Sequence, residues 1–380
     1  MTAQKQLRGM TWSDPRGYDP LIAATSAFRE RHPDVDIIWD KRSLQGFEST
    51  PVDELASQYD LIIIDHPHVG AIVQQNCLLP LDAYAPEDHL EQLLAETVGK
   101  SFQSYFYKGH QWATPVDAAC QVQAIRPDLT SAPLKTFDDV MKQARDERVV
   151  WPLRPPHVLM SFFSLLANSG APFPVTLTSR LDPIAAQKVL EYMKTLASLV
   201  DPACKTMDPI AALDALSDGD QFGFCPLVYL YAPYARDGYR PHRIAFHDMA
   251  TFGKSGPLGS ALGGTGLAVS AKTRHPDLCV EFALWVASAT IQSSIYADNN
   301  GQPGNAIAWG HDNVNAPVGG AYHNTRLTHE AAWLRPRHSG YMGFQEEGSQ
   351  IVLDAITGKT AVTTAIAALQ KRFDESFSND

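Results

Sequence analysis

The sequence predicts an α/β fold with a doubly wound, largely parallel sheet, and three observations carry this prediction. The four consecutive aliphatic residues of Leu61–Ile64 show no polar alternation, which is typical of a strand covered by helices on both faces. Strand-like and helix-like segments alternate from Leu7 to Asn76, as in the first half of such a sheet. A length of 380 residues exceeds one typical hydrophobic core and favours two domains.

The first unit of this pattern comprises a strand, a loop and a helix. Leu7–Thr11 is predicted as the strand, and the polar, turn-rich residues 12–18 as the loop. Asp19-Pro20 predicts the helix start, because Asp is a favoured cap and Pro is tolerated in the first turn. The next predicted elements are a strand over Val35–Trp39 and a helix over Asp53–Gln58.

A polar turn follows the aliphatic strand and precedes a helix predicted over Val69–Asn76. Pro67 has no amide hydrogen and is expected to push His66 out of helical geometry. The arrangement places Asp65 and His66 at the carboxyl edge of the sheet, where open α/β sheets bind ligands. The alternative is that Asp65 only caps the helix and His66 is an ordinary loop residue.

The rest of the chain continues the α/β pattern. A hairpin is predicted with its turn at Lys108-Gly109. The remaining predicted strands are Gln121–Ile125, Val149–Leu153, Phe222–Tyr231 and Ala261–Ser270. The remaining predicted helices are Phe137–Arg145, Val158–Ala167, Pro183–Val200, Asp208–Leu216, Asp277–Ser288 and a helical end over Gly348–Phe373.

Composition excludes several classes of protein. A net charge of -11 without a run of Lys or Arg argues against a nucleic-acid partner. The 5 Cys lack the spacing of a disulfide framework or a zinc site, and Cys225 and Cys279 are expected to be small buried apolar residues. No stretch approaches the roughly 20 apolar residues of a membrane span. The first residues lack the apolar middle of a signal peptide, so either a leader was removed or the protein is never exported.

Motifs for catalysis, cofactors and metals fail on inspection. Gly253-Lys254-Ser255 is like the end of a phosphate-binding loop, but Asp248 stands where that loop needs Gly. Gly264–Gly266 precedes a strand rather than a helix, and His329-Glu330 lacks the second His of a zinc protease. We therefore predict no catalytic residue, no cofactor and no metal, although paired carboxylates cannot be recognised from spacing.

Four patches of sequence resemble one known family in their order and spacing. Cys77–Asp82 resembles a Gly-Leu-Leu-x-Pro-Leu-Asp stretch, and Gly109–Val116 resembles a Gly-x-x-Tyr-Gly-Leu-Pro crossover. Leu134–Val140 resembles a Pro-x-Thr-Trp-Asp-Glu stretch, and Gly263–Ser270 with Glu281–Trp285 resembles a returning strand and helix. Over its whole length the chain thus resembles the type-1 extracellular solute-binding proteins of bacterial ABC importers, the maltose-binding-like group.

The resemblance implies a two-lobed periplasmic-binding-protein-like fold of type II. Each lobe would be a sheet flanked by helices, and crossing hinge segments would join the lobes. The implied lobes are residues 1–114 with 261–309 and residues 115–260 with 310–380, with a ligand cleft between them that closes on a solute. The implied function is capture of a small polar solute for the transmembrane subunits of an ABC permease, by a monomeric, periplasmic protein. The chain departs from the family pattern at two places. Ile125-Arg126 stands where the family often has Tyr-Asn, and Thr265 stands at a position that is usually aromatic. Both differences alter the sugar-stacking geometry that the family would lead us to expect.

Candidate ligand contacts lie at strand ends and at the crossovers. The ring of Trp12 could stack on a sugar, and Asp14 and Arg16 could bind hydroxyls or acids, although Trp12 could instead pack into the lobe. Trp151 and His157 are weaker candidates, since Trp151 could be core. Tyr229 and Tyr231 are expected to share a face because alternate strand residues do. The full predicted set is Trp12, Asp14, Arg16, Asp65, His66, Trp112, Asp117, Tyr229, Tyr231, Gly264 and Thr265.

The nature of the solute stays open at this point. Carbohydrate is the first expectation, because of the family and the aromatic residues. A small organic or sugar acid is the second, since Arg16, Arg154 or Arg335 could clamp a carboxylate. A cytoplasmic sensor or an enzyme built on the same fold is the remaining alternative.

Overall fold

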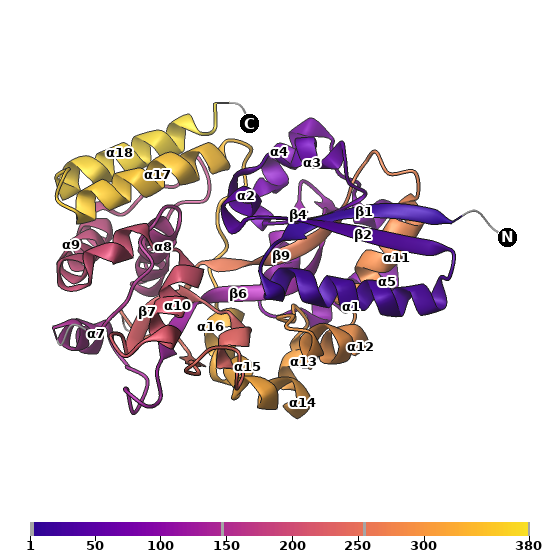
Figure 1. Ribbon diagram of the computed structural model, residues 1–380. Helices are drawn as coiled ribbons and strands as arrows, with labels where there is room; N and C mark the ends of the chain where they lie inside the picture. The colour runs from indigo at the N-terminus through magenta and orange to yellow at the C-terminus, as the bar shows by residue number, and fades with distance from the viewer. Residues whose placement is uncertain (1–3, 146–147, 254–255, 379–380) are drawn as a thin grey trace. The chain divides into compact units, whose positions relative to one another are not determined.

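The computed structural model describes residues 4–145, 148–253 and 256–378, and Lys254 and Ser255 of the rejected phosphate-loop pattern lie outside them. The chain divides into two compact units (Figure 1). Unit 1 comprises Met1–Ala118 and Gly263–Ala316, and unit 2 comprises Ala119–Leu262 and Pro317–Asp380. Both units combine sheet strands with helices, which confirms the predicted α/β class.

The sheet of unit 1 is built around the aliphatic strand. Its strand order is β2 (Val35–Arg42), β1 (Lys5–Trp12), β3 (Leu61–Ile64), β9 (Leu262–Val269) and the start of β6 (Thr114–Ile125). Strand β1 runs parallel to β2 and β3, whereas β9 is antiparallel to β3. All residues of β3 are buried, as the absence of polar alternation predicted. The predicted parallel core is confirmed, and a late segment of the chain adds the antiparallel strand.

Helix α1 (Pro15–Arg31) begins earlier than the sequence analysis placed it. The cap is Asp14, whose side chain accepts a hydrogen bond from the amide of Arg16 at 2.9 Å. The predicted loop over residues 12–18 is therefore wrong, as is the predicted start at Asp19-Pro20. This segment contains two Asp-Pro pairs, Asp14-Pro15 and Asp19-Pro20, and the earlier pair caps the helix while Pro20 is tolerated inside it.

The connection from β2 to β3 holds two short helices. Strand β2 continues to Arg42, three residues beyond its predicted end at Trp39. Ser43 then caps α2 (Leu44–Ser49), which the sequence analysis missed, and α3 (Val52–Ala56) lies within two residues of its predicted bounds. After β3 a 3-10 helix, η1 (His66–His68), begins at His66, so the prediction of non-helical geometry there is wrong. Helix α4 (Val69–Gln75) follows as predicted.

The remaining elements of unit 1 include the predicted hairpin, β4 (Phe106–Tyr107) and β5 (His110–Gln111). Its turn residues Lys108 and Gly109 have φ values of 48° and 88°, a conformation that favours Gly. The helices are η2 (Leu81–Ala83), α5 (Glu87–Glu96), α6 (Ser101–Ser104), α11 (Pro276–Ala287), α12 (Ala289–Ile291), the π-helix η5 (Gln292–Tyr296), α13 (Ala306–Gly310) and α14 (Asp312–Asn315).

The sheet of unit 2 consists of the end of β6 with β7 (Phe224–Tyr229) and β8 (Ala245–His247), both antiparallel to it. Helices α8 (His157–Asn168), α9 (Pro183–Leu199), α17 (Tyr341–Ile356) and α18 (Val362–Glu375) pack together (Figure 1). The others are α7 (Phe137–Ala144), η3 (Pro202–Thr206), α10 (Pro209–Asp218), η4 (Ala232–Ala235), η6 (Ala316–Val318), which starts in unit 1, α15 (Ala321–Asn324) and α16 (Arg326–Glu330).

Two strand predictions in unit 2 need correction. The segment Val149–Leu153 is not a strand, because only Val149 forms a bridge, to Phe224, and Pro152 has no amide hydrogen for a ladder. Strand β7 ends at Tyr229, so Tyr231 lies outside it. The helical end predicted over 348–373 is two helices, α17 and α18, with a break between them.

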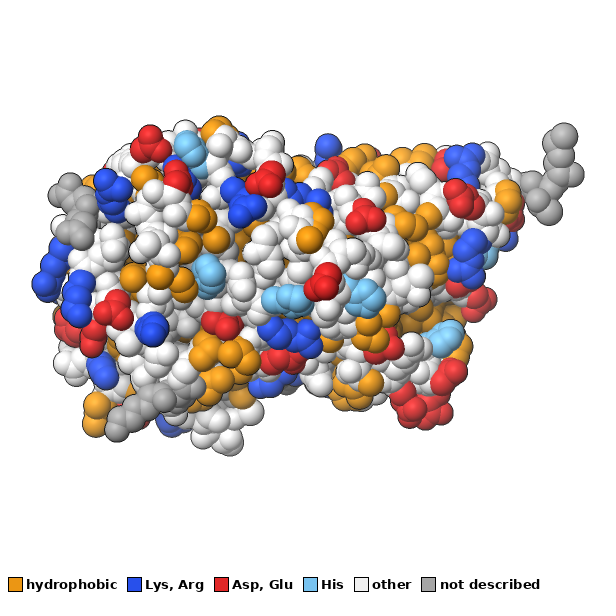
Figure 2. All heavy atoms as spheres, turned by 90° about the horizontal axis from the view of Figure 1, so that it is seen from below, with side chains coloured by type: hydrophobic (Ala, Val, Ile, Leu, Met, Phe, Trp, Pro, Cys, Tyr) orange, Lys and Arg blue, Asp and Glu red, His pale blue; other side chains and the backbone are white. Residues whose placement is uncertain are grey.

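Other sequence predictions concern cysteines, membrane spans and charge. All 5 cysteines are free and buried, which confirms the prediction for Cys225 and Cys279. Within the described ranges no single helix is long and apolar enough to cross a membrane, and the pair Pro276–Ala287 and Ala289–Tyr296, bent by 54°, passes that test only jointly. On the face drawn in Figure 2, acidic, basic and hydrophobic side chains are interspersed.

Candidate ligand-binding site

The carboxyl edge of the unit 1 sheet brings several of the predicted residues together. Asp14 follows the end of β1, Arg42 ends β2, and Asp65 follows the end of β3. Thr265 joins the same edge from the antiparallel strand, since Gly266 pairs with Ile64. We call this group of strand ends the unit 1 edge.

Trp12 is buried at this edge, with 3% of its surface exposed. Its ring lies 5.3 Å from that of Phe47 and directly beneath Gly17, where a Cβ atom would come within 2.3 Å of the indole. The ring therefore packs in the core of unit 1, which corresponds to the alternative reading of Trp12. Its indole nitrogen Nε1 is buried and has no hydrogen-bond acceptor among the described residues.

Arg16 and Asp117, both predicted as ligand contacts, bind each other. The Arg16 Nε donates to Asp117 Oδ2 at 2.7 Å, and its Nη2 donates to Asp117 Oδ1. Both side chains are buried, with 4% and 0% of their surfaces exposed. The bidentate pair joins the first turn of α1 to β6, so each charge is compensated inside the protein. Asp14 lies nearby, and burial raises the pKa of its carboxyl group.

Asp65 and His66 form a local pair after β3. Asp65 caps η1 by accepting the amide of His66 at 2.9 Å, and the imidazole Nδ1 lies 3.3 Å from the same carboxylate oxygen. His66 is fully buried, with the edge of Tyr105 against it at a centroid distance of 6.3 Å. Asp65 thus performs the capping role, and a ligand contact for either residue stays a prediction.

Trp112, Gly264 and Thr265 complete the predicted set in unit 1. Trp112 is buried in the hairpin, where its indole N–H donates to the carbonyl of Tyr107 at 3.0 Å. Gly264 has φ +94°, a conformation that L side chains rarely adopt. Thr265 is buried, and its hydroxyl has no hydrogen-bond partner among the described residues.

Arg42 is a residue of the unit 1 edge that the sequence analysis missed. Its Nη2 donates to the carbonyl of Ile63 at 3.2 Å, and its guanidinium lies 5.4 Å from the centre of the Phe47 ring. Its Nε and Nη1 are buried without a hydrogen-bond partner in the described part of the chain, and burial lowers the pKa of Arg42 to about 10. Arg42 lies three residues beyond the predicted strand end, and the polar residues Asp40 to Arg42 give no alternation that would have extended the strand to it.

In unit 2 the two predicted tyrosines have different surroundings. Tyr229 ends β7 half-buried, with its ring 6.4 Å from that of His157. Tyr231 is buried at the cap of η4, with its ring 6.4 Å from that of Tyr234. Strand alternation does not relate the two rings, because β7 ends at Tyr229, and a ligand contact for either tyrosine stays a prediction.

The weaker candidates of unit 2 are also buried. Trp151 is fully buried, and its indole N–H donates to Ser161 Oγ at 3.2 Å, so it is a core residue. His157 begins α8, and burial, with the nearby charges of Arg154 and Arg335, lowers its pKa to about 3. Its imidazole is therefore neutral at physiological pH.

The other arginines considered as carboxylate clamps are held by protein groups. Arg154 lies 3.3 Å from the carboxylate of Asp208. Arg335 donates to the carbonyl of Leu262 at 3.2 Å and to Gln345 Oε1 at 3.1 Å. Within the described residues no group of three His, Cys, Asp or Glu side chains is placed to hold a metal ion.

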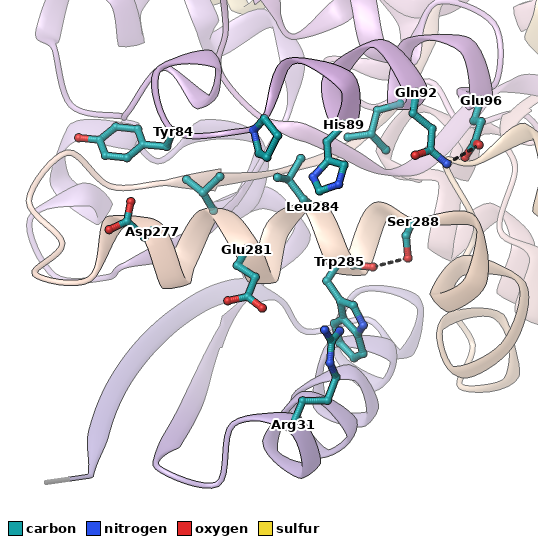
Figure 3. A pocket seen from close by; sticks show the side chains of 13 residues that line it. Arg31, Tyr84, His89, Gln92, Glu96, Asp277, Glu281, Leu284, Trp285 and Ser288 are labelled. Atoms are coloured by element: carbon teal, nitrogen blue, oxygen red, sulfur yellow. Dashed lines mark hydrogen bonds between the residues drawn. The ribbon is translucent and has the colours of Figure 1, made fainter. Parts of the chain in front are cut away.

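A separate cavity of about 470 Å³ lies between α5 and α11 of unit 1 (Figure 3). His89 and Gln92 of α5 and Leu284 and Trp285 of α11 line it, with Arg31 beside Trp285. Arg31 ends α1, whereas the unit 1 edge lies at the start of that helix, about 24 Å away at 1.5 Å per residue. No residue of the predicted set is among those that line this cavity.

Comparison with known proteins assigns the chain to a family. Residues 23–315 match the bacterial extracellular solute-binding proteins. The chain belongs to this family. A maltotriose-binding protein of Pyrococcus abyssi is 27% identical to this solute-binding protein over 130 residues, which are 32% of this chain and 28% of that protein. The matched stretch thus spans little more than a quarter of that curated relative.

Solved structures extend the match to nearly the whole length. A maltose-bound protein of T. maritima has a TM-score of 0.82 at 16% identity, covering 96% of this chain and 98% of that one. An ABC transporter solute-binding protein of Agrobacterium radiobacter in complex with ribitol has a TM-score of 0.80 at 18% identity, covering 98% and 99%. The GacH receptor of Streptomyces glaucescens, solved with acarbose, has a TM-score of 0.81 at 15% identity, covering 98% of each. At these identities the likeness shows the fold, and it confirms the expected two-lobed solute-binding-protein class.

Proposed function

We propose that this protein is the solute-binding component of an ABC importer and captures a small polar solute of the carbohydrate class. The family assignment over residues 23–315 is the observation that carries the proposal. The structural relatives were solved with maltose, ribitol and acarbose, which are sugars or polyols, and this supports the same class of solute here. The solute would be released to a permease outside the cytoplasmic membrane, and the protein would act as a monomer.

The unit 1 edge supplies chemistry suited to a hydroxylated solute. Asp65 and Thr265 offer a carboxylate and a hydroxyl, and both stand at strand ends where α/β sheets bind ligands. The predicted contacts from unit 2 are Tyr229 and Tyr231. The predicted lobes, residues 1–114 with 261–309 and 115–260 with 310–380, would close on the solute by a hinge motion.

A thermal unfolding screen over sugars, polyols and their acids tests the proposal. A cognate solute at one hundred times its dissociation constant should stabilise the protein by about 2.7 kcal/mol. Small-angle scattering should then show a smaller radius of gyration with that solute than without it. An absence of stabilisation across the whole screen, or an unchanged radius at saturation, would contradict solute capture by closure.

The enzyme alternative is separated by recovery of the solute. Incubation with excess protein should return the solute chemically unchanged, because a transport component binds without bond making. Product formation in proportion to the amount of protein would contradict the transport function and indicate an enzyme instead. Cell fractionation tests the location, since a protein found only in the cytoplasm would contradict delivery to an importer.

A further inference from the structure

The unit 1 edge contains a positive charge, that of Arg42, for which the described residues supply no ion-pair partner. The Arg42 guanidinium bonds one backbone carbonyl, that of Ile63, and faces the Phe47 ring. Its Nε and Nη1 are buried without an acceptor among the described residues. A buried donor without an acceptor destabilises the folded protein, more so when the group is charged, so it needs an explanation.

A second donor without an acceptor stands beside it. Trp12 and Arg42 are register partners on the parallel strands β1 and β2. Both contact the same ring, since Phe47 lies 5.3 Å from the Trp12 ring and 5.4 Å from the Arg42 guanidinium. The buried indole Nε1 also has no acceptor in the described part of the chain. Two neighbouring side chains thus present N–H groups, and one of them is charged.

The chemistry of this pair specifies its occupant. A carboxylate spans one edge of a guanidinium, so its two oxygens would accept the second hydrogen of Nη2 together with a hydrogen of either Nε or Nη1, and the indole N–H can bond either oxygen. A neutral hydroxyl could accept one of these bonds but would leave the buried charge uncompensated. A phosphate group carries close to two negative charges near neutral pH, which is more than one arginine compensates.

We infer that Arg42, with the indole N–H of Trp12, binds the carboxylate of the solute, so that the ligand is a sugar acid or a related hydroxylated carboxylic acid rather than a neutral sugar. This inference rests on the proposed function and specifies its substrate. Thr265 stands at the same edge, its hydroxyl has no hydrogen-bond partner within the described ranges, and it would bind the hydroxylated part of that acid.

Matched solute pairs test the inference by isothermal titration calorimetry on the full chain. The pairs are D-glucuronate with D-glucose, D-galacturonate with D-galactose, and D-gluconate with D-glucitol, and glucose 6-phosphate is the phosphate probe. At least one acid should bind at least about thirtyfold tighter than its neutral partner. This factor is the lower end of the change in affinity found when one partner of a desolvated charge pair is removed. Tighter binding of the neutral partners, or of glucose 6-phosphate, would overturn the inference while leaving solute capture intact. Binding of none of the acids would also overturn the inference, whereas solute capture itself is decided by the thermal unfolding screen.

Variants assign the effect to Arg42. Arg42→Met should weaken the acid at least about thirtyfold and change the neutral partner less than about threefold. Arg42→Lys keeps the charge but not the bidentate geometry and should fall between the two. Arg29→Met removes the same charge from an exposed site on α1 and should leave both affinities unchanged. Equal loss with the acid and the neutral partner would overturn the inference, and the wild-type pairs decide it even if a variant fails to fold.

Discussion

Two arginines near the carboxyl ends of the unit 1 strands differ in what compensates their charge. Arg16 makes a bidentate ion pair with Asp117, 101 residues away in the chain, and both side chains are buried. Arg42 is half-buried with its Nε and Nη1 atoms fully covered, and among the described residues its guanidinium contacts one backbone carbonyl and one aromatic ring. The same residue type in the same layer of the fold can thus be a structural pair or an open donor. The difference lies in whether a distant carboxylate reaches it.

The largest effect should come from breaking the compensated pair. Arg16→Met leaves Asp117 buried and unpaired, which should reduce the free energy of unfolding by about 3–5 kcal/mol. Urea denaturation measures the loss. The double variant Arg16→Met with Asp117→Leu should recover most of it, since an apolar pair can replace a buried ion pair. A loss below about 1 kcal/mol for the single variant would show that the pair does not hold α1 to β6.

Trp12 is close to both arginines. It shortly precedes the first turn of α1, which holds Arg16, and it is the register partner of Arg42 on the neighbouring strand. Its burial against Phe47 and Gly17 predicts that Trp12→Ala costs about 3–5 kcal/mol of folding stability. Melting without solute and titration with it separate the two roles of the side chain. A large loss of affinity beside an unchanged melting temperature would assign Trp12 to ligand stacking instead of the core.

His157 extends the comparison to unit 2, where neighbouring positive charges act on a titratable group. Its pKa is lowered from 6.5 to about 3 in the folded protein, so below pH 6.5 the unfolded chain binds the proton more readily. The contribution of His157 should therefore lower the free energy of unfolding as the pH falls, by roughly 3 kcal/mol between pH 7 and pH 4. Stability measured against pH for wild type and His157→Leu should show a flatter acid limb in the variant. Parallel curves would contradict the buried neutral imidazole.

The smallest effect on stability is expected for Arg42. Arg42→Met should change the unfolding free energy by less than about 1 kcal/mol, because the lost ring contact and hydrogen bond oppose the relief of a buried charge. Equilibrium unfolding of Arg42→Met and of Arg16→Met under the same conditions compares the two arginines directly. A loss for Arg42→Met as large as that for Arg16→Met would mean that Arg42 is a structural group as well.

Local pattern predicted the parts of the fold that depend on neighbours in the chain. The unbroken aliphatic run of β3 and the Lys108-Gly109 turn were predicted within a residue, since burial on both faces and left-handed backbone leave direct marks on residue type. The start of α1 was misplaced because two Asp-Pro pairs carry the same capping signal, and the sequence does not rank them.

For the candidate site, the sequence alone determined which residues stand near strand ends, and the tertiary structure decided which of them remain available. The polar character of their segment predicted ligand contacts for Trp12, Asp14 and Arg16. Their burial, however, depends on the start of α1 at Pro15 and on the ion pair of Arg16 with Asp117 of β6. Arg42 was missed because its significance is that its Nε and Nη1 have no acceptor in the described part of the chain, and a missing contact between distant residues leaves no mark on neighbouring positions. Charge compensation acts through space over a few ångströms, so only the folded chain determines which arginine is neutralised and which can bind a solute.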